Sequence, residues 1–120
     1  MKILLVEDNI KMRAMIKKYL ERSLKNIDVI YECDDGAKAI ELYTQFQPDW
    51  VLMGINLKNV DGLTATQAIT NINPTVKILI VTQYNDPAYR EAAFEAGASN
   101  YILKDNIAEI PKLILSINCN

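Results

Sequence analysis

Short apolar runs alternate along this chain with longer segments in which apolar residues recur at helical spacing. A strand exposed on one face alternates apolar with polar residues, whereas a strand covered on both faces is apolar throughout. The pattern therefore predicts an α/β fold in which helices cover both faces of a parallel sheet. The predicted strands are Ile3–Val6, Val29–Cys33 (more mixed), Trp50–Met53, Ile78–Val81 and Tyr101–Leu103.

Five helices are predicted between and after these strands. The first carries an apolar stripe on one side and charged residues on the other, and the stripe consists of Met12, Met15, Ile16, Tyr19 and Leu20. The other four cover residues 37–46, 63–72, 87–96 and about 111–117, with Asp, Pro and Gly at their ends. Short connections and right-handed crossovers favour a doubly wound open sheet of five strands.

Length and composition narrow the functional classes. We expect residues 1–120 to form one domain with a full core. Thirteen Lys and Arg against fifteen Asp and Glu leave no basic field for a phosphate backbone, so direct nucleic-acid binding is not expected. The absence of histidine excludes Ser-His-Asp and Cys-His catalysis and His-ligated zinc.

The two cysteines, Cys33 and Cys119, lie far apart and match no metal-binding or redox spacing. We therefore expect free thiols in a reducing compartment. No apolar run is long enough for a signal peptide or a membrane span. The expected location is cytoplasmic, without contact with a membrane.

Chemically active side chains gather where the predicted strands end. Glu7 and Asp8 follow the first strand, Thr82 the fourth and Lys104 the fifth, which itself contains Tyr101. In a doubly wound sheet, ligands bind at the carboxyl ends of the strands, where the strand order reverses. The acid pair either caps the next helix or holds a hard cation such as Mg²⁺. The hydroxyl and the ammonium suit an anion, although each residue alone is also compatible with an ordinary structural role.

Six stretches carry a resemblance to a known family in both order and spacing. They are Ile3–Asn9, Asp34–Ala39, Pro48–Met53, Val60–Gly62, Leu79–Thr82 and Gly97–Asp105. Together they make the whole chain similar to the receiver domain of two-component response regulators. The resemblance implies a phosphorelay signalling module rather than an enzyme, with the flavodoxin-like strand order 2-1-3-4-5.

The resemblance also implies roles for individual residues. Asp8 directly, and Glu7 through water, would bind Mg²⁺, and Asn56 would lend a backbone carbonyl. Thr82 and Lys104 would contact phosphoryl oxygens, and Tyr101 would turn inward when Thr82 moves.

Partners follow from the resemblance as well. A sensor histidine kinase or a phosphotransfer protein would supply the phosphoryl group to an aspartate at the end of the third strand. The face formed by the fourth helix, fifth strand and fifth helix would report the change, and it is a possible homodimer interface.

That aspartate is absent, because residue 54, at the acceptor position, is glycine. Glycine offers no atom to attack phosphorus. Asp49 lies at the far end of the same strand, ~16 Å away at the usual strand rise, and Asp61 lies well along the next loop. With only Glu7 and Asp8 left, we expect a weakened Mg²⁺ site.

The origin of Gly54 stays open between a deliberate replacement of the acceptor and a natural loss of phosphotransfer. Because the other site residues remain, a deliberate or recent change is favoured. Two smaller departures are Gln83, where the family has a small residue, and Asp105, where many members have proline. We expect the Lys104–Asp105 peptide to be trans or locally strained.

We therefore predict a response regulator receiver that cannot accept phosphate at Gly54 and acts by protein contacts. One alternative is a flavodoxin-like carrier of a flavin or nucleotide, although the acidic loop after the first strand would repel phosphate. Another is a metal-dependent phosphatase or nuclease, although further acids at the other strand ends are missing.

Overall fold

The computed structural model describes residues 1–118 and shows five parallel strands in one sheet, in the order β2-β1-β3-β4-β5. This confirms the predicted doubly wound topology. The strands agree with the predicted runs to within one residue at each end, and they are β1 (Lys2–Val6), β2 (Val29–Cys33), β3 (Trp50–Met53), β4 (Lys77–Thr82) and β5 (Asn100–Leu103).

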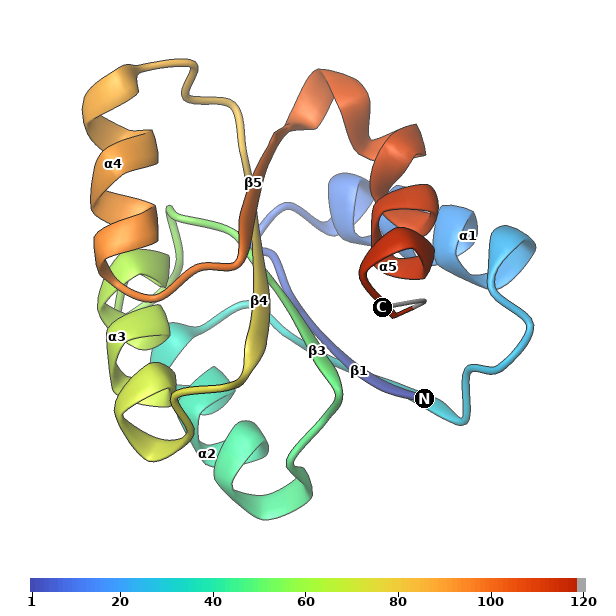
Figure 1. Cartoon of the computed structure of the whole chain (residues 1–120), viewed down its shortest axis with the longest axis horizontal. Helices are drawn as coiled ribbons and strands as arrows, with labels where there is room; N and C mark the ends of the chain where they lie inside the picture. The colour runs from blue at the N-terminus through green and yellow to red at the C-terminus, as the bar shows by residue number, and fades with distance from the viewer. Residues whose placement is uncertain (119–120) are drawn as a thin grey trace.

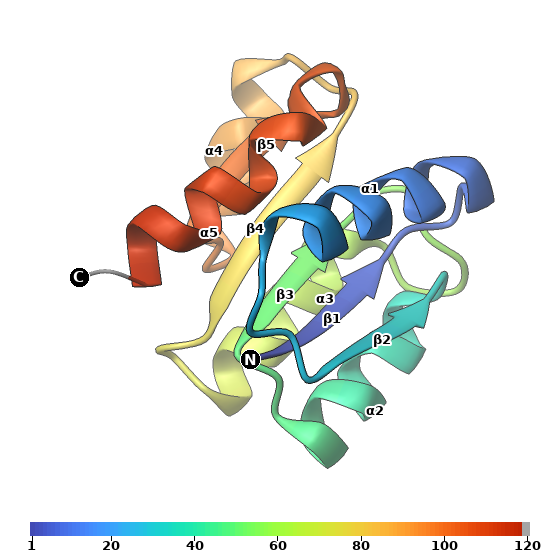
Figure 2. The same cartoon turned by 90° about the vertical axis from the view of Figure 1, so that its right-hand side faces the viewer.

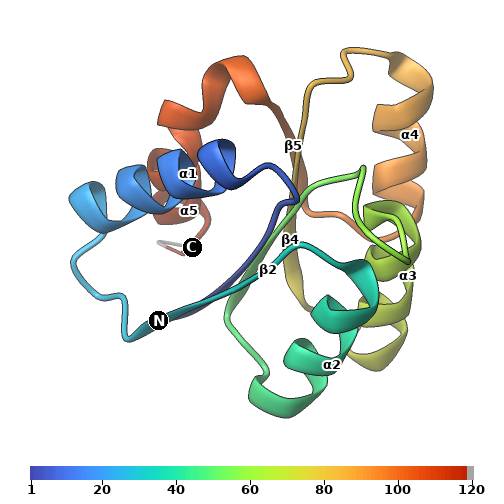
Figure 3. The same cartoon turned by 180° about the vertical axis from the view of Figure 1, so that it is seen from behind.

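Helices cover the sheet on both faces (Figures 1 and 3). One face carries α1 and α5, which lie in front of the sheet in Figure 2, and the other carries α2, α3 and α4. The helices match the predictions closely, and they are α1 (Ile10–Ser23), α2 (Gly36–Phe46), α3 (Gly62–Ile72), α4 (Pro87–Glu95) and α5 (Ile110–Asn118).

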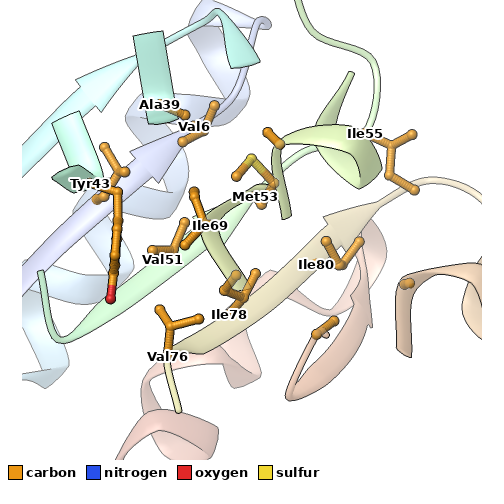
Figure 4. Close-up of a cluster of buried hydrophobic side chains, with 14 of the residues drawn as sticks. Val6, Ala39, Tyr43, Val51, Met53, Ile55, Ile69, Val76, Ile78 and Ile80 are labelled. Atoms are coloured by element: carbon orange, nitrogen blue, oxygen red, sulfur yellow. The ribbon is translucent and has the colours of Figure 1, made fainter. Parts of the chain in front are cut away.

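Successive residues of each strand point to opposite faces, so every central strand contributes to two cores. Alternate residues such as Val6, Met53 and Ile80 pack against α2 and α3, as Figure 4 shows. The residues between them, such as Leu5, Leu52 and Val81, pack against α1 and α5. Burial on both faces is the reason for the continuously apolar runs, and it leaves the strand ends as the places for polar chemistry.

Asparagine or aspartate caps the first four helices. The Asn9 side chain accepts a hydrogen bond from the Met12 N–H at 2.9 Å, and Asp61 accepts from the Thr64 N–H at 2.9 Å and from its hydroxyl at 2.8 Å. Asp35 and Asp86 cap α2 and α4 in the same way. The alternative in which Glu7 or Asp8 caps the first helix is therefore wrong, because Asn9 satisfies these N–H groups.

A 3₁₀ helix, η1 (Lys104–Glu109), joins β5 to α5 and was not predicted. It is too short for an apolar period of its own, and it is held in place by the burial of Ile107 beside α5. Among residues 1–118 no peptide bond is cis, so the Lys104–Asp105 bond is trans as expected.

Cys33 is a free, half-buried thiol, and burial raises its pKa, which disfavours the reactive thiolate. Cys119 lies outside the described residues. None of the helices within residues 1–118 has the length and apolar character that crossing a membrane requires.

The start of α3 packs directly on the backbone at the end of β3. A Cβ at Gly62 would lie 1.7 Å from the Gly54 carbonyl oxygen, whereas a Cβ at Gly54 would meet its nearest atoms at 3.3 Å. We predict that Gly62→Ala lowers the free energy of unfolding by about 3 kcal/mol, and that Gly54→Ala changes it by less than about 1 kcal/mol. Urea unfolding measures both, and equal losses would contradict this packing.

The Asp61 cap gives a pH dependence. Partial burial raises the pKa of Asp61, but hydrogen bonds from Thr64 and Leu63 outweigh burial and lower it overall. A lowered folded-state pKa stabilises the fold above the unfolded pKa, and this contribution is lost as pH falls through the folded value. Asp61→Ala is expected to cost about 1 kcal/mol near neutral pH.

The loss of unfolding free energy caused by Asp61→Ala should shrink as the pH falls from about 6 to about 3. The matched control is Asp61→Asn, which keeps a capping oxygen without a charge. The stability of this variant should therefore lack the pH dependence that ionisation of Asp61 causes. Urea unfolding across the range measures the difference from the parent chain. A loss that stays constant with pH would show that ionisation of Asp61 contributes nothing.

Candidate functional site

A polar cavity of about 340 Å³ opens at the carboxyl ends of β1, β3 and β4. It brings together five of the six predicted site residues with Gly54, and these five are Glu7, Asp8, Asn56, Thr82 and Lys104. Asn9, Ile55, Val81, Gln83 and Tyr84 complete its lining. Tyr101 does not line this cavity, and its hydroxyl contacts the backbone carbonyl of Tyr84. The structure thus brings these five side chains together at one edge of the sheet, while their roles stay predictions.

An ion pair within the cavity joins Glu7 to Lys104. The Lys104 Nζ lies 3.1 Å from Glu7 Oε1 and donates a hydrogen bond to Oε2 at 3.2 Å, and Oε2 also accepts from the Asn9 N–H at 3.0 Å. Oε1 has the ammonium beside it but no hydrogen bond of suitable angle, so its contact is ionic. These two residues are 97 positions apart in the chain.

Burial sets the energetics of this pair. The Glu7 side chain is 2% exposed and that of Lys104 is 22% exposed. Burial raises the pKa of Glu7, and the Asn9 N–H and the Lys104 ammonium partly offset this by stabilising the carboxylate. The positive charge that the resemblance assigns to phosphoryl oxygens is therefore already paired with an internal carboxylate.

Asp8 lies exposed at the rim of the cavity. Glu7 and Asp8 are the two carboxylates among the cavity residues, and no cluster of three or more His, Cys, Asp or Glu suited to a metal occurs within residues 1–118. Mg²⁺ prefers near-octahedral oxygen coordination, and here one of its two candidate carboxylates is engaged by Lys104. The side chains present therefore fit such an ion only in part.

Gly54 follows β3 and faces the Glu7 carboxylate. A Cβ at this position would lie 3.3 Å from both Glu7 Oε1 and the Val6 carbonyl oxygen. The φ angle of Gly54 is not positive, since Gly97 is the glycine with positive φ among residues 1–118. Its backbone conformation therefore does not require glycine.

The two other acids considered as acceptors are engaged elsewhere. Asp49 accepts a hydrogen bond from the N–H of Lys2, at the opposite end of the sheet from the cavity. Asp61 caps α3. Neither side chain lines the cavity, in agreement with the prediction that they cannot replace the missing acceptor.

Thr82 and Tyr101 are linked through Tyr84. The Thr82 hydroxyl is buried and accepts a hydrogen bond from the Tyr84 N–H at 3.2 Å. The Tyr101 hydroxyl donates to the Tyr84 carbonyl at 2.6 Å, and its side chain points inward, with the residue 6% exposed. Burial raises the pKa of Tyr101, and the nearby Arg90 partly offsets this.

Tyr84 is the residue that sequence reasoning missed. Its hydroxyl accepts a hydrogen bond from the side-chain amide of Asn56, and its ring stacks on Tyr89 of α4. The position of Tyr84 was the available signal, because it lies two residues after Thr82, in the loop at the carboxyl end of β4. A tyrosine in a loop is not distinctive, however, so only the fold shows its contacts.

The family model for the response regulator receiver domain matches residues 3–115. This chain belongs to that family. Receiver domains are signalling modules of two-component systems, they interact with histidine kinases or phosphotransfer proteins, and they generally bind Mg²⁺ at the phosphorylation site.

Individual relatives agree with this assignment. The receiver is 34% identical to the transcriptional regulatory protein LnrK of Bacillus subtilis over 98% of this chain and 53% of the relative. It is also 34% identical to the chemotaxis protein CheY of the same organism over 86% of this chain and 84% of the relative. The receiver spans about half the length of the transcriptional regulators it matches.

Solved structures show the same fold. A LuxR-family two-component response regulator from Aurantimonas superposes with a TM-score of 0.89 at 34% identity, covering 97% of this chain and 83% of that one. The signal receiver domain of the response regulator NarL from Mycobacterium tuberculosis gives 0.88 at 27% identity, covering 97% and 94%.

Removal of Lys104 tests the buried ion pair. We predict that Lys104→Met lowers the free energy of unfolding at neutral pH by about 2 kcal/mol, because Glu7 stays buried without its cation. Methionine preserves the length of the side chain. The Glu7→Gln/Lys104→Met double variant should recover most of the loss, since it removes the stranded charge. Urea unfolding of the parent chain, Glu7→Gln, Lys104→Met and the double variant gives the coupling energy, and a double variant as unstable as Lys104→Met would argue against the pairing.

Proposed function

We propose that this receiver takes no phosphoryl group at position 54 and acts through protein contacts in its unphosphorylated form. Gly54 carries the proposal, because it faces the cavity where the family places its acceptor carboxylate. An acyl phosphate forms only when a carboxylate oxygen attacks phosphorus, and Gly54 has no such oxygen.

The charges around Gly54 support the same proposal. Lys104 is held by Glu7, so the cation expected to attract phosphoryl oxygens is neutralised within the chain. Of the two carboxylates that line the cavity, Glu7 is buried and Asp8 lies at the rim. We infer that Mg²⁺ binds weakly here, through Asp8, Glu7 and the Asn56 carbonyl, since a third carboxylate is missing.

The partner class and the contact face are part of the proposal. The partner is a sensor histidine kinase or a phosphotransfer protein, as for other receivers. The half-exposed apolar side chains of Tyr89 and Phe94 in α4 and of Leu115 in α5 favour protein contact along the α4, β5 and α5 face. A second copy of this chain is one candidate occupant of that face.

The flavin or nucleotide carrier is not favoured. The family match points to signalling, and the loop after β1 presents Glu7 and Asp8 rather than a glycine-rich phosphate cradle. The cavity also lacks the further acids that a two-metal phosphatase or nuclease would use.

Phosphorylation by a small phosphodonor in the presence of Mg²⁺ tests the proposal. We predict that intact-mass spectrometry shows no adduct of about 80 Da, the mass of one phosphoryl unit, on the parent chain. Gly54→Asp should acquire the adduct, because it restores a carboxylate beside Glu7 and Asp8. Gly54→Asn is the matched control, with similar size and no nucleophilic carboxylate. A stoichiometric adduct on the parent chain would refute the proposal.

A further inference from the structure

Tyr84, in the loop between β4 and α4, contacts four separate residues. Its N–H donates to the Thr82 hydroxyl and its carbonyl accepts from the Tyr101 hydroxyl. Its own hydroxyl accepts from the Asn56 amide, and its ring stacks on Tyr89 with centroids 4.4 Å apart and planes at 9°. One residue thus contacts the loop after β3, the end of β4, β5 and α4.

The rigid side chain of Tyr84 links its hydrogen bond from Asn56 to its stack on Tyr89. The hydroxyl and the ring of Tyr84 belong to one rigid group, so a rotation that breaks the hydrogen bond to Asn56 also changes the stack on Tyr89. Asn56 lines the cavity, whereas Tyr89 lies in the first half of α4 and is 37% exposed on the outer surface. Core packing explains why the Tyr84 ring is partly buried, but it does not by itself connect these two ends.

We propose that Tyr84 is a positioning residue that couples the rim of the cavity to α4. Asn56, Tyr84 and Tyr89 are named here the tyrosine latch. A group that engages the Asn56 amide competes with the Tyr84 hydroxyl and loosens the hold on Tyr89. By thermodynamic reciprocity, a partner that moves Tyr89 changes the rim to the same extent.

The latch deepens the proposed function, and rests on it, because it supplies an input to α4 that needs no phosphoryl group on residue 54. The physical basis is the contiguous set of contacts from Asn56 through Tyr84 to Tyr89. The proposal adds a released arrangement in which these contacts are broken, and either end can shift the balance between the two. The Asn56 side chain is connected to α4 by way of the Tyr84 ring, so the route does not depend on a carboxylate at position 54.

NMR spectroscopy of the intact chain tests the route from α4 to the rim. The reference is Tyr84→Phe, which removes the hydroxyl and moves the side-chain amide signals of Asn56 to their unbonded positions. Tyr89→Ala should move the same signals part of the way in the same direction, because an unstacked Tyr84 ring holds its hydroxyl less firmly.

Phe94→Ala is the matched control for this direction. Phe94 is also an exposed aromatic of α4, but its ring lies beside Arg90, so the Asn56 signals should not move. The latch is refuted if Tyr89→Ala leaves these signals in place, or if Phe94→Ala moves them as far. Both side chains are partly exposed, so the variants are expected to fold.

Hydrogen exchange tests the route from the rim to α4. The Arg90 N–H donates to the Asp86 carbonyl in the first turn of α4. Asn56→Ala should speed its exchange about three- to tenfold, the range that one aromatic contact supports. Lys58→Ala is the control, because Lys58 lies in the same loop but pairs with Asp34, and it should leave Arg90 unchanged. Equal exchange rates in all three proteins would overturn the coupling.

These measurements use no phosphodonor, so they separate the two proposals. An adduct on the parent chain would defeat the proposed function while leaving the latch intact if the NMR signals behave as described. Unmoved Asn56 signals together with a missing adduct would defeat the latch alone.

Discussion

Helices cover the sheet on both faces, and this leaves no place for a charged side chain in the middle of the central strands β1, β3 and β4. Val6, Met53 and Val81 are 1% exposed or less, and Glu7, Asn56 and Thr82 lie at or just beyond the ends of these strands. Because the strands are parallel, their carboxyl ends share one edge, and the cavity forms there. The site is thus a consequence of how the core is buried rather than an addition to it.

Within that cavity, the loss of one carboxylate changes the balance of charge. Lys104 reaches across the edge of the sheet to Glu7, and burial makes it costly to remove either partner alone. The ammonium of Lys104 thus contacts a carboxylate of the same chain, and under the proposed function this pairing competes with an incoming anion. The contacts of Tyr84 with Asn56 and Tyr89 run from this cavity to α4, and the proposed latch is built on them.

Sequence reasoning reached most of the fold and named five of the residues that line the cavity. The apolar runs located every strand, and Asp35, Asp86 and Pro87 marked helix starts that the structure confirms. The roles of Asp8, Asn56 and Lys104 toward Mg²⁺ and phosphate remain predictions. Reasoning from the residues failed at the start of α1, where several neighbouring residues could cap the helix and Asn9 does so in place of the acids beside it. It also missed η1, because this short helix has no periodic pattern to reveal it.

The sequence by itself determined the sheet, the edge where the polar residues meet and the missing side chain at position 54, because each depends on the order and type of residues along the chain. Only the tertiary structure decided that Glu7 pairs with Lys104 and that Tyr84 joins Asn56 to Tyr89. These contacts depend on side-chain directions between segments far apart in sequence. Burial and hydrogen-bond geometry choose among many possible partners only once the chain has folded.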